Sequence, residues 1–187
     1  DLAWSPTSGG MLVFSRGGSG SPGVYGRTLD SSLNFGDLVD VQLGQTGQVA
    51  VIYGEGVWAT SWLPVGQPLP ELSFVLLDRN GLRGAPKVVP SGAPGGVHLS
   101  YGQNYFAAAW TRSGTNADGL AVRRPSLTLF DGLGDVVDTT DIPGPSLSGV
   151  ARDVAWVGSQ GFAVAWEERA ADTARLGITR ATTQGTF

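Results

Sequence analysis

The stretch Gly161-Phe162-Ala163-Val164-Ala165-Trp166 alternates large and small side chains and ends on a tryptophan. Three other stretches share this pattern: GMLVF at 10–14, VWATSW at 57–62 and YFAAAW at 105–110. The aromatic residues that end the four stretches are 48, 48 and 56 residues apart. A regular period of this size predicts a repeat architecture.

Each repeat divides into four short β segments. The first segment carries an aromatic residue nine or ten positions before the final aromatic of the second: Trp4, Tyr53, Tyr101 and Trp156. Turns rich in Gly or Asn join the two segments, as in a β-hairpin. Two further segments follow in the first three repeats, and four antiparallel strands in about 48 residues are typical of a β-propeller blade.

We therefore predict an all-β fold: a β-propeller of four repeats, or a four-blade section of a larger propeller. The chain of 187 residues is predicted to form a single domain with repeats at about 1–47, 48–96, 97–149 and 150–187. Too few residues follow Thr182 for another strand, so the last blade is expected to lack its outer strand. Because an open sheet edge invites pairing, we expect the chain to be part of a longer polypeptide or to pair with another chain. The alternative is a self-contained four-bladed propeller.

The alternation also predicts how the blades stack. Successive residues of a strand point to opposite faces, so each second strand has one bulky and one mostly small face. Packing the bulky face of one sheet onto the small face of the next would fill the space between them. The predicted blade-packing residues are Phe14, Trp62, Trp110 and Trp166.

Composition excludes several classes of function. The net charge of −4 argues against nucleic acid as a partner, because phosphate binding needs a basic surface. There is no run of apolar residues long enough to span a membrane. Cysteine is absent and histidine occurs once, which argues against zinc, and no cofactor is predicted.

The pattern resembles that of bacterial secreted or cell-surface β-propeller repeat proteins. The resemblance rests on Trp156, on the turn at 158–161, on the stretch 162–169 (FAVAWEER), and on the hydrophobic-Asp pairs at 29–30, 77–78 and 130–131. The fourth repeat departs from the pattern, with Ala181-Thr182 at that place. The resemblance implies an extracellular or cell-surface location and adhesion, assembly or ligand binding rather than catalysis.

Few residues suggest catalytic chemistry. His98 is interpreted as a strand residue without a catalytic role. Glu167 and Glu168 are adjacent on a strand, so they point to opposite faces and cannot form a carboxylate pair. Asp153 could face another acid across a central channel, but Asp1 is expected to be offset from it.

The acidic stretch from Asp131 to Asp135, with Asp138 and Asp141 beyond, has alternating acids that could hold Ca²⁺. It lacks the dense oxygen ligands and the closing Glu of a calcium loop. We therefore interpret it as a turn and predict no metal site.

The loops between second and third strands vary most among the repeats, and function tends to lie on such loops. Arginines near this rim form a weak candidate binding site for a carboxylate, a sulfated sugar or a protein: Arg16, Arg112, Arg123, Arg124 and Arg169. The sequence thus predicts a non-enzymatic extracellular binding or assembly module that contacts a protein through these loops or the open edge of the last blade. A lectin-like carbohydrate-binding propeller is the alternative.

Overall fold

We describe the chain from a computed structural model, in which residues 1–67, 70–90, 95–116, 118–143, 148–170 and 173–183 are placed well enough to describe. The described residues form four antiparallel sheets, each built from one continuous stretch of chain. The first sheet contains β1 (Leu2–Ser5), β2 (Gly9–Arg16), β3 (Gly23–Leu29) and β4 (Phe35–Leu43). The second contains β5 (Gly47–Gly54), β6 (Val57–Pro64), β7 (Leu72–Asp78), β8 (Gly81–Leu82) and β9 (Lys87–Val89).

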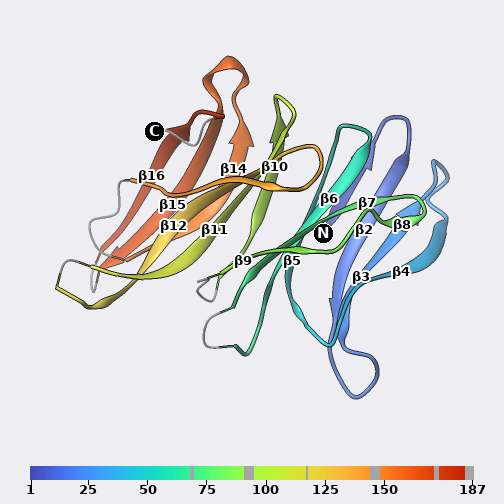
Figure 1. The fold of residues 1–187 in the computed structure, drawn as a ribbon, viewed down its shortest axis with the longest axis horizontal. Helices are drawn as coiled ribbons and strands as arrows, with labels where there is room; N and C mark the ends of the chain where they lie inside the picture. Colours follow the sequence, from blue (N-terminus) through green and yellow to red (C-terminus); the bar gives the residue numbers. More distant parts are fainter. Residues whose placement is uncertain (68–69, 91–94, 117, 144–147, 171–172, 184–187) are drawn as a thin grey trace.

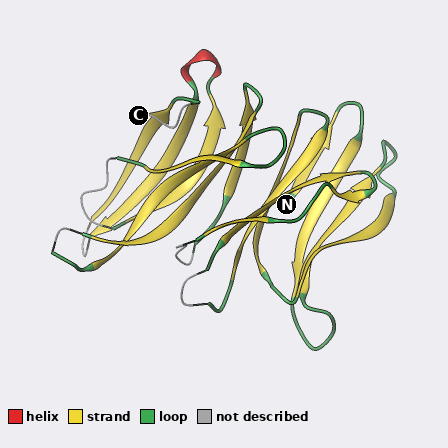
Figure 2. Cartoon of the chain, viewed as in Figure 1, coloured by secondary structure: helices red, strands yellow, loops and turns green. Residues whose placement is uncertain are grey.

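The third sheet contains β10 (His98–Gly102), β11 (Tyr105–Thr115), β12 (Ala121–Phe130) and β13 (Val136–Asp141). The fourth contains β14 (Gly149–Trp156), β15 (Phe162–Ala170) and β16 (Thr173–Ala181). In the second sheet β8 and β9 both pair with β7, so its outer strand is interrupted. One short 3₁₀ helix, Gly158–Gln160, lies among the described residues, between β14 and β15 (Figure 2).

Tight turns set the register of the inner hairpins. Glu55 and Gly56, between β5 and β6, both have positive φ angles, 51° and 80°. Gln103 and Asn104 do the same between β10 and β11, at 50° and 66°. Two consecutive positive φ values are the signature of the type I′ turn, whose twist matches that of the flanking strands.

The four sheets stand in a row, with the first sheet at one end and the fourth at the other (Figure 1). The first strands of neighbouring sheets contact one another, β1 with β5, β5 with β10 and β10 with β14. These strands therefore form the inner side of the array, and β4, β9 and β13 the outer side.

Each second strand has two faces, which we name by their residues. The aromatic face carries the final aromatic and the residue two before it: Leu12 and Phe14, Thr60 and Trp62, Ala108 and Trp110, Val164 and Trp166. The opposite face carries the two intervening residues: Met11 and Val13, Ala59 and Ser61, Ala107 and Ala109, Ala163 and Ala165.

Three buried clusters fill the spaces between the sheets. In the first, Trp58 and Trp62 pack with Met11 and Val13. The second joins Phe106 and Trp110 of the third sheet to residues of the second that include Ala59 and Phe74. The third joins Phe162 and Trp166 to residues that include Ala107 and Ala109. Every one of these interfaces therefore packs the aromatic face of one sheet onto the opposite face of the sheet before it.

Glycine allows a close approach at the inner hairpins. The Tyr101 ring lies where a Cβ on Gly54 would be, and the Trp156 indole lies where a Cβ on Gly102 would be. In the third and fourth sheets, the aromatic residue of the first strand thus covers the glycine that ends the first strand of the preceding sheet. A side chain larger than hydrogen at either glycine would displace that ring.

The all-β prediction is confirmed, as is the prediction of repeated antiparallel sheets. The described part of the fourth sheet has three strands. A closed propeller is not established, because no closed barrel is present among the described residues. None of the helices in the described part is both long and apolar enough to cross a membrane.

Candidate active site

A cavity of about 530 Å³ lies along the first strands of the sheets. All four sheets contribute to its wall, and its polar lining residues are Asp1, Gln48, His98 and Asp153. Backbone and apolar groups around Ala50 and Gly96 complete part of the lining. A concave site with a few convergent polar groups is the usual form of a ligand-binding or catalytic site.

Register shows that three of these side chains occupy equivalent places. Asp153 pairs with Ala165 and His98 pairs with Ala109, in each case opposite the residue that precedes the final tryptophan. Asp1 and Val13 exchange backbone hydrogen bonds of 2.8 and 2.9 Å, so Asp1 lies opposite the residue that precedes Phe14. Ala50, which pairs with Ser61, holds this place in the second sheet. We call Asp1, Ala50, His98 and Asp153 the inner column.

The Asp1 carboxylate is held between two sheets. Its Oδ2 accepts a hydrogen bond of 3.0 Å from the backbone N–H of Val51 on β5, and its Oδ1 accepts one of 2.9 Å from Leu2. Hydrogen bonds from backbone N–H groups to a carboxylate are charge-assisted and stronger than neutral ones. They fix the orientation of the group at the cavity wall.

A β-bulge places Asp153. The register of β14 against β15 skips from Ala151 to Asp153, so Arg152 is the extra residue. Bulges re-aim neighbouring side chains and are frequent beside active sites. The Asp153 Oδ1 atom accepts a hydrogen bond of 2.8 Å from the N–H of Val154.

The bulge residue Arg152 is itself paired. Its guanidinium contacts the Glu167 Oε2 atom through Nε at 2.7 Å and Nη2 at 2.5 Å. Glu167 is buried, so the arginine compensates a carboxylate removed from water. The ion pair links the bulge residue, which precedes Asp153, to β15.

His98 lines the cavity near Gln48. Burial lowers the pKa of His98 below 6.5, the nearby charge of Asp153 raises it, and that of Arg152 lowers it. A Cβ placed on Gly96 would lie 3.1 Å from His98 Nε2 and 3.2 Å from Gln48 Oε1, so both polar groups converge there. The lowered pKa favours a neutral imidazole at pH 7, able to donate at one nitrogen and accept at the other.

The expectation that Asp1 is offset from Asp153 is wrong, because register puts them in the same place. The signal was present in the sequence: Asp1 precedes Phe14 by 13 residues, and Asp153 precedes Trp166 by 13. The interpretation of His98 as a strand residue is correct for the backbone, and the structure adds that it lines the cavity. The sequence analysis did not identify Gln48, because no amide residue occurs at the equivalent position of the other repeats.

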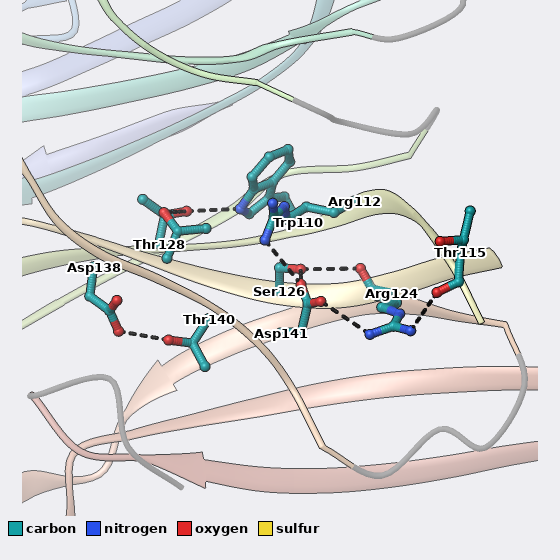
Figure 3. A network of polar contacts seen from close by, with 10 residues as sticks. Trp110, Arg112, Thr115, Arg124, Ser126, Thr128, Asp138, Thr140 and Asp141 are labelled. Atoms are coloured by element: carbon teal, nitrogen blue, oxygen red, sulfur yellow. Dashed lines mark hydrogen bonds and ion pairs between the residues drawn. The ribbon is translucent and has the colours of Figure 1, made fainter. Parts of the chain in front are cut away.

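Two of the predicted rim arginines meet on one acid (Figure 3). Arg112 Nη1 lies 3.2 Å from Asp141 Oδ1, and Arg124 Nη1 lies 3.5 Å from Asp141 Oδ2. The Ser126 hydroxyl donates to the same carboxylate at 2.8 Å, and Arg124 also donates to the Thr115 carbonyl at 2.8 Å. This network ties β11, β12 and β13 together.

The structure does not bring the other predicted arginines into that network. Arg16 ends β2 in the first sheet and lies beside Phe14 and Tyr25. The backbone N–H group of Arg123 donates a hydrogen bond of 2.7 Å to the Ser148 hydroxyl oxygen. The side chain of Arg169 lies outside the described residues.

The acidic stretch near Asp131 forms a turn. Asp131 Oδ1 accepts hydrogen bonds of 2.9 Å from the N–H groups of Leu133 and Asp135, and the Asp135 carboxylate lies 2.6 Å from Lys87 Nζ. These contacts engage both carboxylates. Within the described residues, no cluster of three or more His, Asp or Glu side chains has a geometry suited to a metal ion.

The predicted blade-packing residues occupy different environments. Trp62 and Trp110 are fully buried, and Trp166 is 4% exposed. The indole N–H groups of Trp110 and Trp166 donate to Thr128 and Thr179, both at 3.0 Å. Phe14 is only partly buried and stacks on Tyr25 with a ring separation of 5.8 Å.

Comparison with solved structures finds carbohydrate-active enzymes. The chain is similar to the endo-arabinase from Bacteroides thetaiotaomicron, with a TM-score of 0.55 and 15% identity over 98% of this chain and 75% of that one. A glycosyl hydrolase from Bacteroides ovatus aligns with a TM-score of 0.44 and 9% identity, over 97% of this chain and 63% of that one. No protein-family model matches the chain, and no curated protein does.

The first of these neighbours corrects the predicted function. The similarity to an endo-arabinase contradicts the expectations of a non-enzymatic binding or assembly module and of a protein without enzymatic activity. The lectin alternative fits less well than an enzyme. The comparisons agree with a propeller-like all-β fold but give no support to the family of secreted repeat proteins.

Proposed function

We propose that the chain is the scaffold of a glycoside hydrolase whose catalytic groups lie in the inner column. The observation that carries the proposal is the presence of Asp1 and Asp153 at equivalent places on one cavity wall, in a fold shared with an endo-arabinase. Most glycoside hydrolases use two carboxyl groups that flank the scissile bond.

The two carboxyl groups divide the acid and base roles. Asp1, which accepts two backbone hydrogen bonds, acts as the carboxylate that removes a proton from the attacking water. Asp153 donates a proton to the glycosidic oxygen, so that the bond from the anomeric carbon to that oxygen breaks as water adds to the carbon. His98 and Gln48 supply neutral donors and acceptors for sugar hydroxyl groups.

The substrate class follows from the neighbour, so an arabinan is the first polymer to test. The assay measures new reducing ends released from arabinan and from a panel of other polysaccharides. We expect Asp1→Asn and Asp153→Asn each to lower kcat by at least about 100-fold, the usual scale of acid–base catalysis. Asp37→Asn, on an exposed part of β4, is the matched control and should leave the rate unchanged.

Two results would count against the proposal. One is the absence of hydrolysis of every polymer by a preparation that circular dichroism shows to be folded. The other is an unchanged rate in both inner-column variants. The extracellular or cell-surface location stays a prediction, which fits an enzyme that acts on polymers too large to enter a cell.

A further inference from the structure

Among the residues that the structure describes, the stacking of the sheets leaves two faces without a neighbouring sheet. They are the aromatic face of the first sheet and the opposite face of the fourth, at the two ends of the row (Figure 1). Each of the three interfaces in the chain joins one face of each kind. The chain therefore carries both halves of a fourth interface of the same type.

The aromatic face of the first sheet is apolar and accessible. Leu12 is partly exposed, whereas Thr60, Ala108 and Val164 at the same place in the other sheets are fully buried. Around Leu12 this face also presents large apolar side chains that are about half exposed: Leu2 at 53%, Trp4 at 47%, Phe35 at 56% and Leu38 at 45%. A shallow depression lies among Leu12, Phe14, Tyr25, Phe35 and Leu38, and Arg16 and Arg27 also line it.

The opposite face of the fourth sheet shows the same contrast. Ile178 pairs with Ala165 and is 75% exposed. Leu127 and Phe74 hold the same place in the third and second sheets, where the next sheet covers them and their exposures are 2% and 0%. Leu176, two residues before Ile178 on the same side of β16, is 76% exposed. Leu176 and Ile178 thus form an exposed apolar pair on a face that also carries Arg180 and Asp153, and exposed apolar side chains grouped on one face point to an interaction site.

We propose that these two faces bind each other between copies of this chain, the aromatic face of the first sheet packing on the opposite face of the fourth sheet of a second copy. The contact continues the stacking rule of the three internal interfaces. It is heterologous, because the two partners contribute different faces. Burial of Leu12 and Ile178, and of the half-exposed residues around them, drives the association.

The association also reaches the cavity. Asp153 pairs with Ala165, so it lies on the face of the fourth sheet that the second copy would cover. The first sheet of the second copy would then close the side of the cavity that Asp153 lines. The proposal is argued from the exposed faces and not from hydrolase activity. Its test measures the mass of the particles in solution.

The test compares two single variants with their mixture by sedimentation velocity at about 5 to 200 μM. Leu12→Glu disables the face of the first sheet, and Ile178→Glu disables that of the fourth. The parent is expected to rise above the mass of one chain, 19.4 kDa, with concentration. Each variant alone should stay at 19.4 kDa, because every possible contact contains one disabled face.

The mixture is the decisive sample. Ile178→Glu keeps the first face intact and Leu12→Glu keeps the fourth, so the two proteins together should form a 1:1 dimer. Leu133→Glu, at a turn residue that is 78% exposed and outside both faces, should associate like the parent. If circular dichroism shows that Leu12→Glu does not fold, Leu38→Glu replaces it on the same face.

Three outcomes would overturn the proposal. A parent that stays monomeric at 200 μM shows that copies of this chain do not occupy the two faces. Association that survives Ile178→Glu but not Leu12→Glu indicates a symmetric contact between two first sheets. Failure of the two folded variants to form a dimer together excludes the heterologous arrangement.

Discussion

The replacement of Trp110 by alanine tests the stacking of the sheets most directly. Its side chain is fully buried in the cluster between the second and third sheets. A buried tryptophan removes roughly 200 Å² from water, which at about 25 cal/mol/Å² corresponds to about 5 kcal/mol. The alanine side chain still contributes part of this burial free energy, and measured Trp→Ala changes in protein cores are about 3–5 kcal/mol.

The lost hydrogen bond adds little to this figure. The indole N–H donates to Thr128 Oγ1 at 3.0 Å, but that hydroxyl also contacts Thr139 Oγ1 at 3.0 Å. Removal of the indole therefore leaves Thr128 with a partner. We expect Trp110→Ala to lower the free energy of unfolding by about 3–5 kcal/mol. Thr128→Val should lower it by about 1–3 kcal/mol, because it leaves the buried indole N–H without its acceptor.

The assay is urea denaturation followed by far-ultraviolet circular dichroism. For a chain of this length, about 3–5 kcal/mol corresponds to a drop in Tm of very roughly 6–20 °C. Trp4→Ala is the control, because Trp4 is 47% exposed and should cost less than about 1 kcal/mol. Equal unfolding midpoints for Trp110→Ala and Trp4→Ala would refute the assignment of Trp110 to a packed interface.

Three further predictions concern the inner hairpins and the cavity. Gly102→Ala should destabilise the fold by about 1–3 kcal/mol in a urea titration, because the new Cβ would overlap the Trp156 indole, whereas Gly17→Ala, which meets open space, should be nearly neutral. The free energy of unfolding should fall as the pH drops below about 6.5, because His98 takes up a proton more readily in the unfolded chain than in the folded chain, where its pKa is lowered. A His98→Gln variant should lose less stability than the parent between pH 7.5 and 5. Equal decreases in the urea midpoints of the two proteins would contradict this. Asp153→Asn should lower the pKa of His98 further, since it removes the charge that raises it, and an unchanged NMR titration would place Asp153 outside its reach.

The strands and their two faces could be predicted from the sequence. Two-residue alternation around Trp110 and Trp166 identifies the second strand of a sheet and separates its two faces, because side chains alternate strictly along a strand. The glycine and asparagine residues of the hairpins report the positive φ angles that the turns require. Whether the row of sheets closes is a property of the angles between sheets, which no local pattern specifies.

The cavity was harder to find, for a physical reason. Its residues come from four segments that lie far apart in sequence, and the first and fourth sheets contribute a single lining residue each. The bulge at Arg152 also breaks the simple alternation of β14, so face assignment by counting fails at that residue. Counting back 13 residues from Phe14 and Trp166 would have aligned Asp1 with Asp153 without any knowledge of the turns.

Most of the inner-column side chains lie outside the packed interfaces between the sheets. The interfaces between sheets are built mainly from the second and third strands, whereas Asp1, His98 and Asp153 face the cavity. Exchanging Asp153, whose carboxylate accepts only a local hydrogen bond from Val154, should therefore alter what the cavity binds with a smaller effect on the unfolding free energy than a change in the packed faces. Ala50, the fourth place in the column, is the exception: it is 5% exposed and belongs to the cluster between the second and third sheets, so at this place the cavity wall is also part of the core and a larger side chain would disturb the packing.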